Sequence, residues 1–222
     1  MTFSELSQNW ESSISLGVKA STAAHYHYTL AHYILPVLGK MRLQTLNEMI
    51  LERGLLQIIT PQDGCHKPLA HSMAQECLVL VRRICRYAAH LHLMPPVQIE
   101  ITLPKSTAKS SAVLNKHEQE QVGRYVASAP TSRKAGLLLM MQMGLRIGEV
   151  CGLQWNDFDL TAGVLSVRRT VKRIYIAGGR TKVVVQTPKT HSSLRQIPIP
   201  KGILQILNRL YSSHAPQEWF LS

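Results

Sequence analysis

Apolar side chains recur at helical spacing through the N-terminal part of the chain. From Phe3 to Ile14 they fall at three- or four-residue intervals and define one apolar face. A second helix follows, and Pro36 and Gly39 are expected to end it. The same spacing places the second helix at residues 21–34 and two further helices at 45–58 and 69–93. Four helices with short connections are typical of a small helical bundle.

A stretch rich in proline and small polar residues interrupts this pattern. Pro95, Pro96 and Pro104 precede the polar segment 105–111, which makes a poor helix and a good linker. The expected organisation is therefore an N-terminal helical domain at 1–95, a linker at 96–112 and a second domain at 113–222.

The second domain begins with helical patterns and then changes to extended ones. Asn115 and Glu118 have the spacing of a capping box at the start of a helix. Gly178-Gly179 is a hairpin signal between runs of β-branched residues. Further helices are predicted over 132–143, 147–153 and 203–210, and strands over 164–176, 181–187 and 194–199. The expected fold class is mainly α with a small antiparallel sheet (α+β).

Positive charge gathers in the second domain. The chain has 25 Lys and Arg against 13 Asp and Glu, a net charge of +12. Residues 1–104 hold 8 against 7, whereas residues 105–222 hold 17 against 6. Such a block favours a polyanionic partner, because each cation set against a phosphate releases condensed counterions. The alternative is a solvated basic face that keeps the protein soluble.

Composition excludes several classes of protein. A hydrophobic fraction of 45% and a charged fraction of 17% exclude wholesale disorder. Apolar runs are too short for a membrane helix, the first residues lack a signal-peptide pattern, and four scattered cysteines suit no disulfide framework. His25, His27 and His32 lack companion ligands at zinc spacing, so no metal or other cofactor is expected. We expect a cytoplasmic protein.

The most informative local sequence lies between Gly144 and Asp157. Gly144 ends a helix and allows a sharp turn, which aims Arg146 out of a rigid corner. Glu149 lies three residues on, shares a helical face with Arg146 and is placed to orient it. An arginine anchored in this way suits bidentate binding of a phosphate. Taken alone, an Arg–Glu pair at this spacing is more often a surface ion pair.

The whole string resembles the box around the first active-site arginine of tyrosine site-specific recombinases, the phage integrase family. That box reads Gly-Leu-Arg-x-x-Glu-x-x-x-Leu-x-Trp-x-Asp. The matching residues are Gly144, Leu145, Arg146, Glu149, Leu153, Trp155 and Asp157. The N-terminal helices resemble the family's SAM-like core-binding domain, so residues 113–222 correspond to the N-terminal part of its catalytic domain.

The resemblance also implies the roles of individual residues. The segment Thr187–Ser193 resembles the turn that carries the family's active-site lysine, here Lys189. Arg146 would then bind the scissile phosphate with Glu149 in support, and Lys189 would protonate the departing 5′ oxygen. Spacing alone favours an ordinary phosphate-contacting or solvated turn lysine, and the arginine box shifts the balance to a catalytic Lys189.

Other basic residues line the predicted sheet and hairpin and are candidates for contact with double-stranded DNA. Phosphate contacts give affinity and register without reading the sequence. Because alternate strand residues face opposite sides, about half of these side chains can reach DNA at once. The candidates are Arg168, Arg169, Lys172, Arg173, Arg180, Lys182, His191 and Arg195.

Two parts of the family's machinery do not occur in these 222 residues. No histidine is followed three residues later by arginine, and no tyrosine follows Tyr211, which lies at helical spacing and is expected to pack. The resemblance therefore implies a recombinase of a mobile element that is truncated before its His-x-x-Arg box and nucleophile. Such a chain would bind DNA, with other recombinase protomers as possible partners, and be unable to cleave it alone. No membrane or small-molecule substrate is expected.

Two other interpretations remain open. The chain could act as a non-catalytic DNA-binding module or regulator derived from an integrase. More distantly, it could be a helical regulator whose basic hairpin reads DNA, with the arginine box a coincidence.

Overall fold

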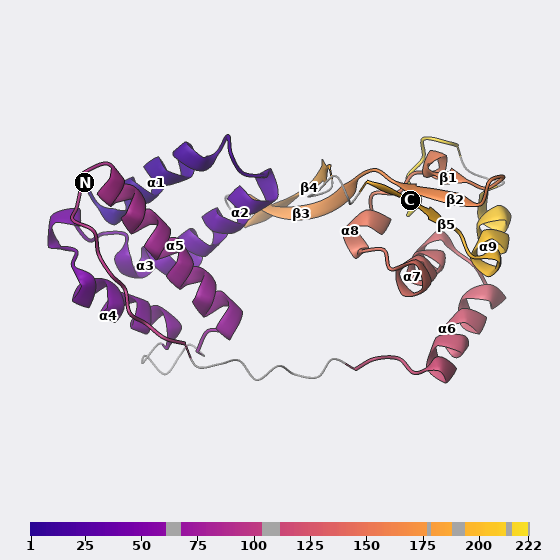
Figure 1. Ribbon diagram of the computed structural model, residues 1–222, viewed down its shortest axis with the longest axis horizontal. Coiled ribbons are helices and arrows are strands. Elements are labelled where there is room, and N and C mark those ends of the chain that lie inside the picture. The colour runs from indigo at the N-terminus through magenta and orange to yellow at the C-terminus, as the bar shows by residue number, and fades with distance from the viewer. Residues whose placement is uncertain (61–67, 104–111, 177–178, 188–193, 212–214, 222) are drawn as a thin grey trace. The chain divides into compact units, whose positions relative to one another are not determined.

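The computed structural model describes residues 1–60, 68–103, 112–176, 179–187, 194–211 and 215–221. The chain divides into two compact units (Figure 1). The first comprises Met1–Lys109 with Ile174–Thr181, and the second comprises Ser110–Arg173 with Lys182–Ser222.

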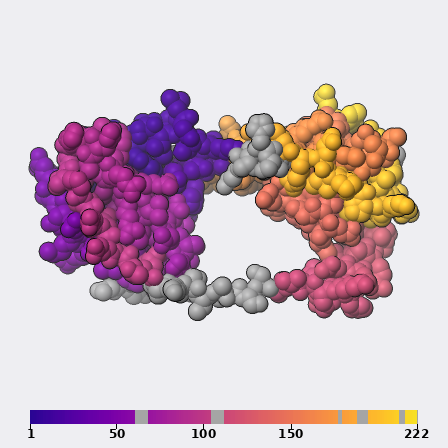
Figure 2. All heavy atoms as spheres, in the orientation of Figure 1, coloured from indigo at the N-terminus to yellow at the C-terminus, as the bar shows by residue number. Residues whose placement is uncertain are grey.

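The first unit contains a helical bundle, as the apolar spacing predicts. The Thr2 hydroxyl and the Glu5 carboxylate form a capping box that starts its first helix, and the Asn47 side chain caps the fourth. Apolar residues of these helices meet in one core, to which the second helix adds only the partly buried Tyr26, and the atoms of this unit pack closely (indigo to magenta in Figure 2). The helices are α1 (Phe3–Ile14), α2 (Ala20–Thr29), the π-helix η1 (Leu30–Ile34), α3 (Leu35–Leu38), the 3-10 helix η2 (Leu43–Thr45), α4 (Glu48–Ile59) and α5 (His71–His90).

The second helix continues past the proline that was expected to end it. A π-helical turn precedes Pro36, in which the Leu35 N–H donates to the Leu30 carbonyl five residues back. Proline in a regular helix lacks a donor and crowds the carbonyl four residues earlier. The wider π turn accommodates the ring, so the chain stays helical to Leu38. The predicted stop at Pro36 is therefore wrong, whereas Gly39 ends the helix as predicted.

Part of the expected linker at 96–112 lies against the first unit. Ile99 is buried in its core, and its carbonyl accepts a hydrogen bond from Arg82 at 2.5 Å. The Gln98 N–H donates to the Glu48 carboxylate at 2.7 Å. The first unit thus extends beyond residue 95, because Gln98 and Ile99 form hydrogen bonds with side chains of α4 and α5.

The second unit begins with helices whose ends follow the sequence signals. Asn115 and Glu118 form the expected capping box, and Gly144 ends the second of these helices with a left-handed φ of 66°. The elements of this unit and its hairpin are α6 (Lys116–Ser128), α7 (Ser132–Met143), α8 (Ile147–Val150), the 3-10 helix η3 (Trp155–Asp157), β1 (Phe158–Asp159), β2 (Val164–Val167), β3 (Thr170–Ile176), β4 (Arg180–Gln186), β5 (Arg195–Pro198) and α9 (Lys201–Tyr211).

The strands form two small sheets, in agreement with the expected α+β class. One sheet has the antiparallel order β1-β2-β5, and the other is the β3–β4 hairpin. Leu165 pairs with Ile197, and Val167 pairs with Arg195. Helices α7 and α9 pack together beside the three-stranded sheet (Figure 1). Strand pairing with β5 therefore brings Arg195 next to the buried end of β2.

The segment 215–221 completes the core of the second unit. The Phe220 N–H donates to the Leu153 carbonyl at 2.9 Å, and the Phe220 side chain is fully buried. Its ring lies 5.1 Å from the rings of Trp155 and Phe158, measured between centroids. The arginine box therefore rests on an aromatic cluster.

Replacing Phe220 with alanine should destabilise the second unit by about 3–5 kcal/mol, because it leaves a cavity among these rings. The neighbouring Trp219→Ala variant is the control, since that side chain is 39% exposed and should cost much less. Urea unfolding measures both. Equal losses of stability would contradict the assignment of Phe220 to the core.

Candidate active site

The turn between α7 and α8 holds Arg146 by its backbone and presents its side chain to solvent. The Arg146 N–H donates to Glu149 Oε2 at 2.9 Å. The neighbouring Leu145 and Val150 are buried, whereas the Arg146 side chain is 75% exposed. The result is a fixed corner with an outward guanidinium, as the sequence predicts.

The Glu149 carboxylate at this corner is buried, with 4% of its side chain exposed. It accepts a single side-chain hydrogen bond from Arg146 Nη1 to Oε1 at 3.2 Å. Arg195 donates to both oxygens, from Nη1 to Oε1 at 3.1 Å and from Nη2 to Oε2 at 3.0 Å. Glu149 is thus bound in a bidentate pair by Arg195 and more loosely by Arg146.

Opposing effects act on the pKa of Glu149. Burial raises the pKa, while hydrogen bonds from the Arg195 side chain and the Arg146 backbone lower it, and the net direction is down. Arg195 responds in the opposite sense, because its hydrogen bonds to Glu149 raise its pKa. Both groups are therefore charged at neutral pH, and the pair is a true ion pair.

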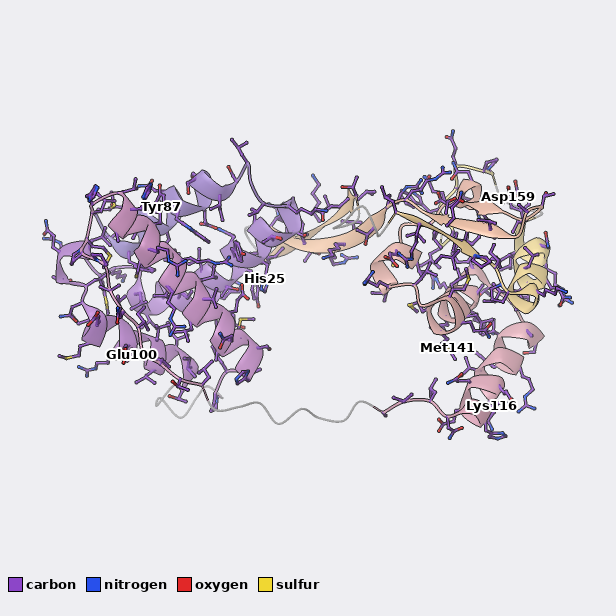
Figure 3. All side chains as sticks on the ribbon, in the orientation of Figure 1. His25, Tyr87, Glu100, Lys116, Met141 and Asp159 are labelled. Carbon is purple, nitrogen blue, oxygen red and sulfur yellow. The ribbon has the colours of Figure 1, made fainter. Side chains whose placement is uncertain are left out.

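A second buried carboxylate fixes the far end of the box. Asp157 accepts from the Gln154 N–H at 2.8 Å and from Arg169 Nη1 at 2.6 Å. Arg169 also donates to the Gly152 carbonyl at 3.1 Å. Asp159, labelled in Figure 3, lies two positions after Asp157 at the end of β1. Each end of the box is held by an arginine from the strand region.

Two glycines let α8 and the turn after it approach the start of β3. A Cβ at Gly148 would lie 2.6 Å from Thr170 Oγ1 and 2.9 Å from the Val171 carbonyl oxygen. At Gly152 it would lie 3.0 Å from the Arg169 carbonyl oxygen. The helix expected over 147–153 ends at Val150, and Gly152 with its close contact to Arg169 lies in the turn that follows.

The candidate DNA-binding residues divide into two groups. Arg195 and Arg169 form ion pairs with the buried carboxylates of Glu149 and Asp157. Their contact with DNA stays a prediction. Consecutive residues of a strand face opposite sides, so Lys172 and Arg173 cannot share one surface. The exposed candidates are Arg168, Lys172, Arg173, Arg180 and Lys182. Lys189 and His191 lie outside the described residues.

Sequence reasoning missed the partners of the two buried carboxylates. Arg195 lies 46 positions after Glu149, and helical spacing has no bearing on such a pair. One signal was present: Glu149 and Asp157 stand among apolar residues of the box. A buried carboxylate needs a cation or hydrogen-bond donors, so two internal arginines could have been expected.

Among the described residues, no three His, Cys, Asp or Glu side chains lie close enough together to hold a metal ion. The helices in the described parts of the chain are too short or too polar to cross a membrane.

Comparisons with known proteins identify the family of the chain and its fold. Residues 112–221 match the model of the phage integrase family, and residues 2–53 match that of the phage integrase N-terminal SAM-like domain. The chain belongs to the phage integrase family. Its similarity to the prophage phiRv2 integrase of Mycobacterium tuberculosis is 26% identity over 96% of this chain. The chain spans 52% of that relative's length.

Other members of the family resemble parts of the chain more closely or share its fold. A XerC-like tyrosine recombinase of Caldanaerobacter subterraneus is 41% identical over 33% of this chain and 20% of its own length. The Tn1549 transposon integrase, solved with a circular intermediate DNA, has a TM-score of 0.74 at 17% identity and covers 97% of this chain and 66% of its own. A lambda integrase dimer bound to a core site has a TM-score of 0.59 at 17% identity, covering 83% and 62%. These structures share the integrase fold.

Adding a methyl group at Gly148 should disturb the corner that carries Arg146. Gly148→Ala should lower the free energy of unfolding by about 1–3 kcal/mol, because the new Cβ meets backbone and side-chain oxygens of β3. Gly123→Ala on α6 is the control. Its Cβ meets nothing within 4 Å, so it should stabilise by about 0.5–1 kcal/mol through helix propensity. Urea titration of both variants measures this, and a neutral Gly148→Ala would disprove the close approach.

The ionised state of Glu149 gives its contribution a definite pH dependence. Its pKa is lower in the folded than in the unfolded chain, so the stabilisation is complete above the ordinary value of 4.5 and is lost as pH falls through the folded-state value. The free energy of unfolding should therefore differ less between wild type and Glu149→Gln at pH 3 than at pH 7. The reason is that the Glu149 carboxylate takes up a proton as the pH falls. A difference that grows in acid would contradict the lowered pKa.

Proposed function

We propose that the chain acts in DNA integration and recombination by phosphotyrosyl strand exchange, with Arg146 as the ligand of the scissile phosphate. The observation that carries this proposal is the Arg146 corner, where a backbone bond to Glu149 fixes the residue and leaves its side chain 75% exposed. A guanidinium presented in this way matches two oxygens of a phosphodiester.

The family resemblance supplies the rest of the reaction. In the family's reaction a tyrosine oxygen attacks the phosphorus, a 3′-phosphotyrosyl bond forms and the 5′ oxygen leaves with a proton. These 222 residues contain no tyrosine after Tyr211 to take that role. Arg146 stabilises the charge on the phosphorane-like transition state, Glu149 supports Arg146, and Lys189 donates the proton to the leaving oxygen. None of these steps needs a metal ion or cofactor.

Double-stranded DNA is the proposed partner, with further recombinase protomers assembled on it. Residues 105–222 carry 17 Lys and Arg against 6 Asp and Glu, and two of those carboxylates are buried in ion pairs. Arg169 and Arg195 are taken up by these pairs, so the rest of the segment carries 15 Lys and Arg against 4 Asp and Glu, a positive surplus suited to phosphate. The solved Tn1549 and lambda integrases were captured on DNA, the latter also as a tetramer on a Holliday junction. A cytoplasmic protein of a mobile element fits this role.

A second candidate function is DNA binding without catalysis. The observation that favours it is the set of exposed basic side chains on β3 and β4, because phosphate contacts of this kind bind DNA without any chemistry. Such a module would occupy a recombination site or interfere with an intact partner.

Removing the Arg146 side chain should weaken binding to duplex DNA. We expect Arg146→Ala to lower affinity about tenfold at low salt and to reduce the slope of log K against log [salt] by about 0.9, the value for one phosphate contact. Fluorescence anisotropy over a salt series measures both quantities. Arg124→Ala, which removes an exposed arginine from α6, shows what the loss of a charge costs elsewhere on the unit. Equal effects of the two variants would contradict a special role for Arg146.

The 222-residue chain should retard duplex DNA at low salt and form no covalent adduct with a nicked suicide substrate. The reason is that the proposed nucleophile is absent from its sequence. Denaturing gel electrophoresis after incubation detects an adduct directly. An adduct formed by the unmodified chain would overturn our account of the nucleophile, and failure to retard DNA would overturn both candidate functions.

A further inference from the structure

We propose that Arg195 is a positioning residue of the recombinase site, which neutralises Glu149 so that the Arg146 guanidinium remains available to a DNA phosphate. This inference rests on the proposed function and deepens it. It assigns Arg195 to the interior of the site and not to direct contact with DNA.

The geometry shows an unequal division of the Glu149 carboxylate between two arginines. Arg195 approaches both oxygens at 3.1 and 3.0 Å, as a planar guanidinium does in a bidentate pair. Arg146 reaches one oxygen with one side-chain nitrogen at 3.2 Å. Exposure follows the same division, since the Arg195 side chain is 28% exposed and that of Arg146 is 75% exposed.

This division has an electrostatic consequence for phosphate binding. Glu149 is buried, and a buried carboxylate must be paired. Without Arg195, the nearest remaining cation shown at Glu149 is Arg146, whose guanidinium would turn inward to form the bidentate pair. A phosphate would then have to compete with a carboxylate for Arg146. With Arg195 in place, one cation balances Glu149 and the other remains for DNA.

The position of Arg195 in the fold also matters. It is held in register opposite the buried Val167 at the start of β5. Lys189, the proposed general acid, precedes it by six residues in the sequence. The Arg195–Glu149 pair therefore attaches the strand that follows the Lys189 segment to the corner that carries Arg146.

The test compares single and double variants for binding to one DNA duplex across a salt series. Arg195→Gln should lower affinity about tenfold and reduce the salt slope by about 0.9, because Arg146 is drawn to Glu149. Arg195→Gln combined with Glu149→Gln removes the competing carboxylate. The double variant should recover the lost affinity and the wild-type salt slope, although Arg195 is missing. Circular dichroism checks that each variant is folded.

Direct contact of Arg195 with DNA gives a different result. The lost phosphate contact could not return when Glu149 is changed, so the double variant would keep the reduced slope, and that result overturns the proposal. If Arg195→Gln alone does not fold, the slope of the folded double variant still decides between the two roles. Arg146→Ala separates the inference from its foundation: if it binds as tightly as wild type, the proposed function itself fails.

Discussion

The buried carboxylate of Glu149 sets the arrangement of the whole candidate site. The Glu149 side chain is 4% exposed, and a carboxylate so deeply buried is stable only when cations and hydrogen-bond donors surround it. Arg195 on β5 donates to both carboxylate oxygens, and the Arg146 N–H in the turn after α7 donates to one of them, Oε2. Such a pair adds little net stability, yet removing one partner typically costs about 3–5 kcal/mol. Its value here is to specify where Arg146 stands.

A second buried carboxylate paired with an arginine lies at the other end of the box. Asp157 is buried and bound by Arg169, while Gly148 and Gly152 let the intervening turn lie directly on the backbone of β3. Two ion pairs and two glycines thus hold one short segment from both sides. The surplus of positive charge acquires two separate uses from this arrangement. Arg169 and Arg195 bind buried carboxylates, whereas Arg168, Arg173 and Arg180 are exposed.

Much of this could be predicted from the sequence, because it depends on local signals. The capping box at Asn115 and the glycine stop at Gly144 operate within a few positions, and each is confirmed. The continuation of the helix through Pro36 could not be predicted, since it depends on a π turn set by packing. The partner of Glu149 was equally hidden. Strand register determines it, and register depends on contacts between residues distant in the sequence.

The most direct test of this account is the coupling energy between Glu149 and Arg195. Urea unfolding of wild type, Glu149→Gln, Arg195→Gln and the double variant gives it as the departure from additivity. We predict a coupling of about 1–3 kcal/mol, with the double variant more stable than the sum of the single losses implies. A coupling within about 0.5 kcal/mol of zero would show that the two side chains act independently, and would contradict the central role of the pair.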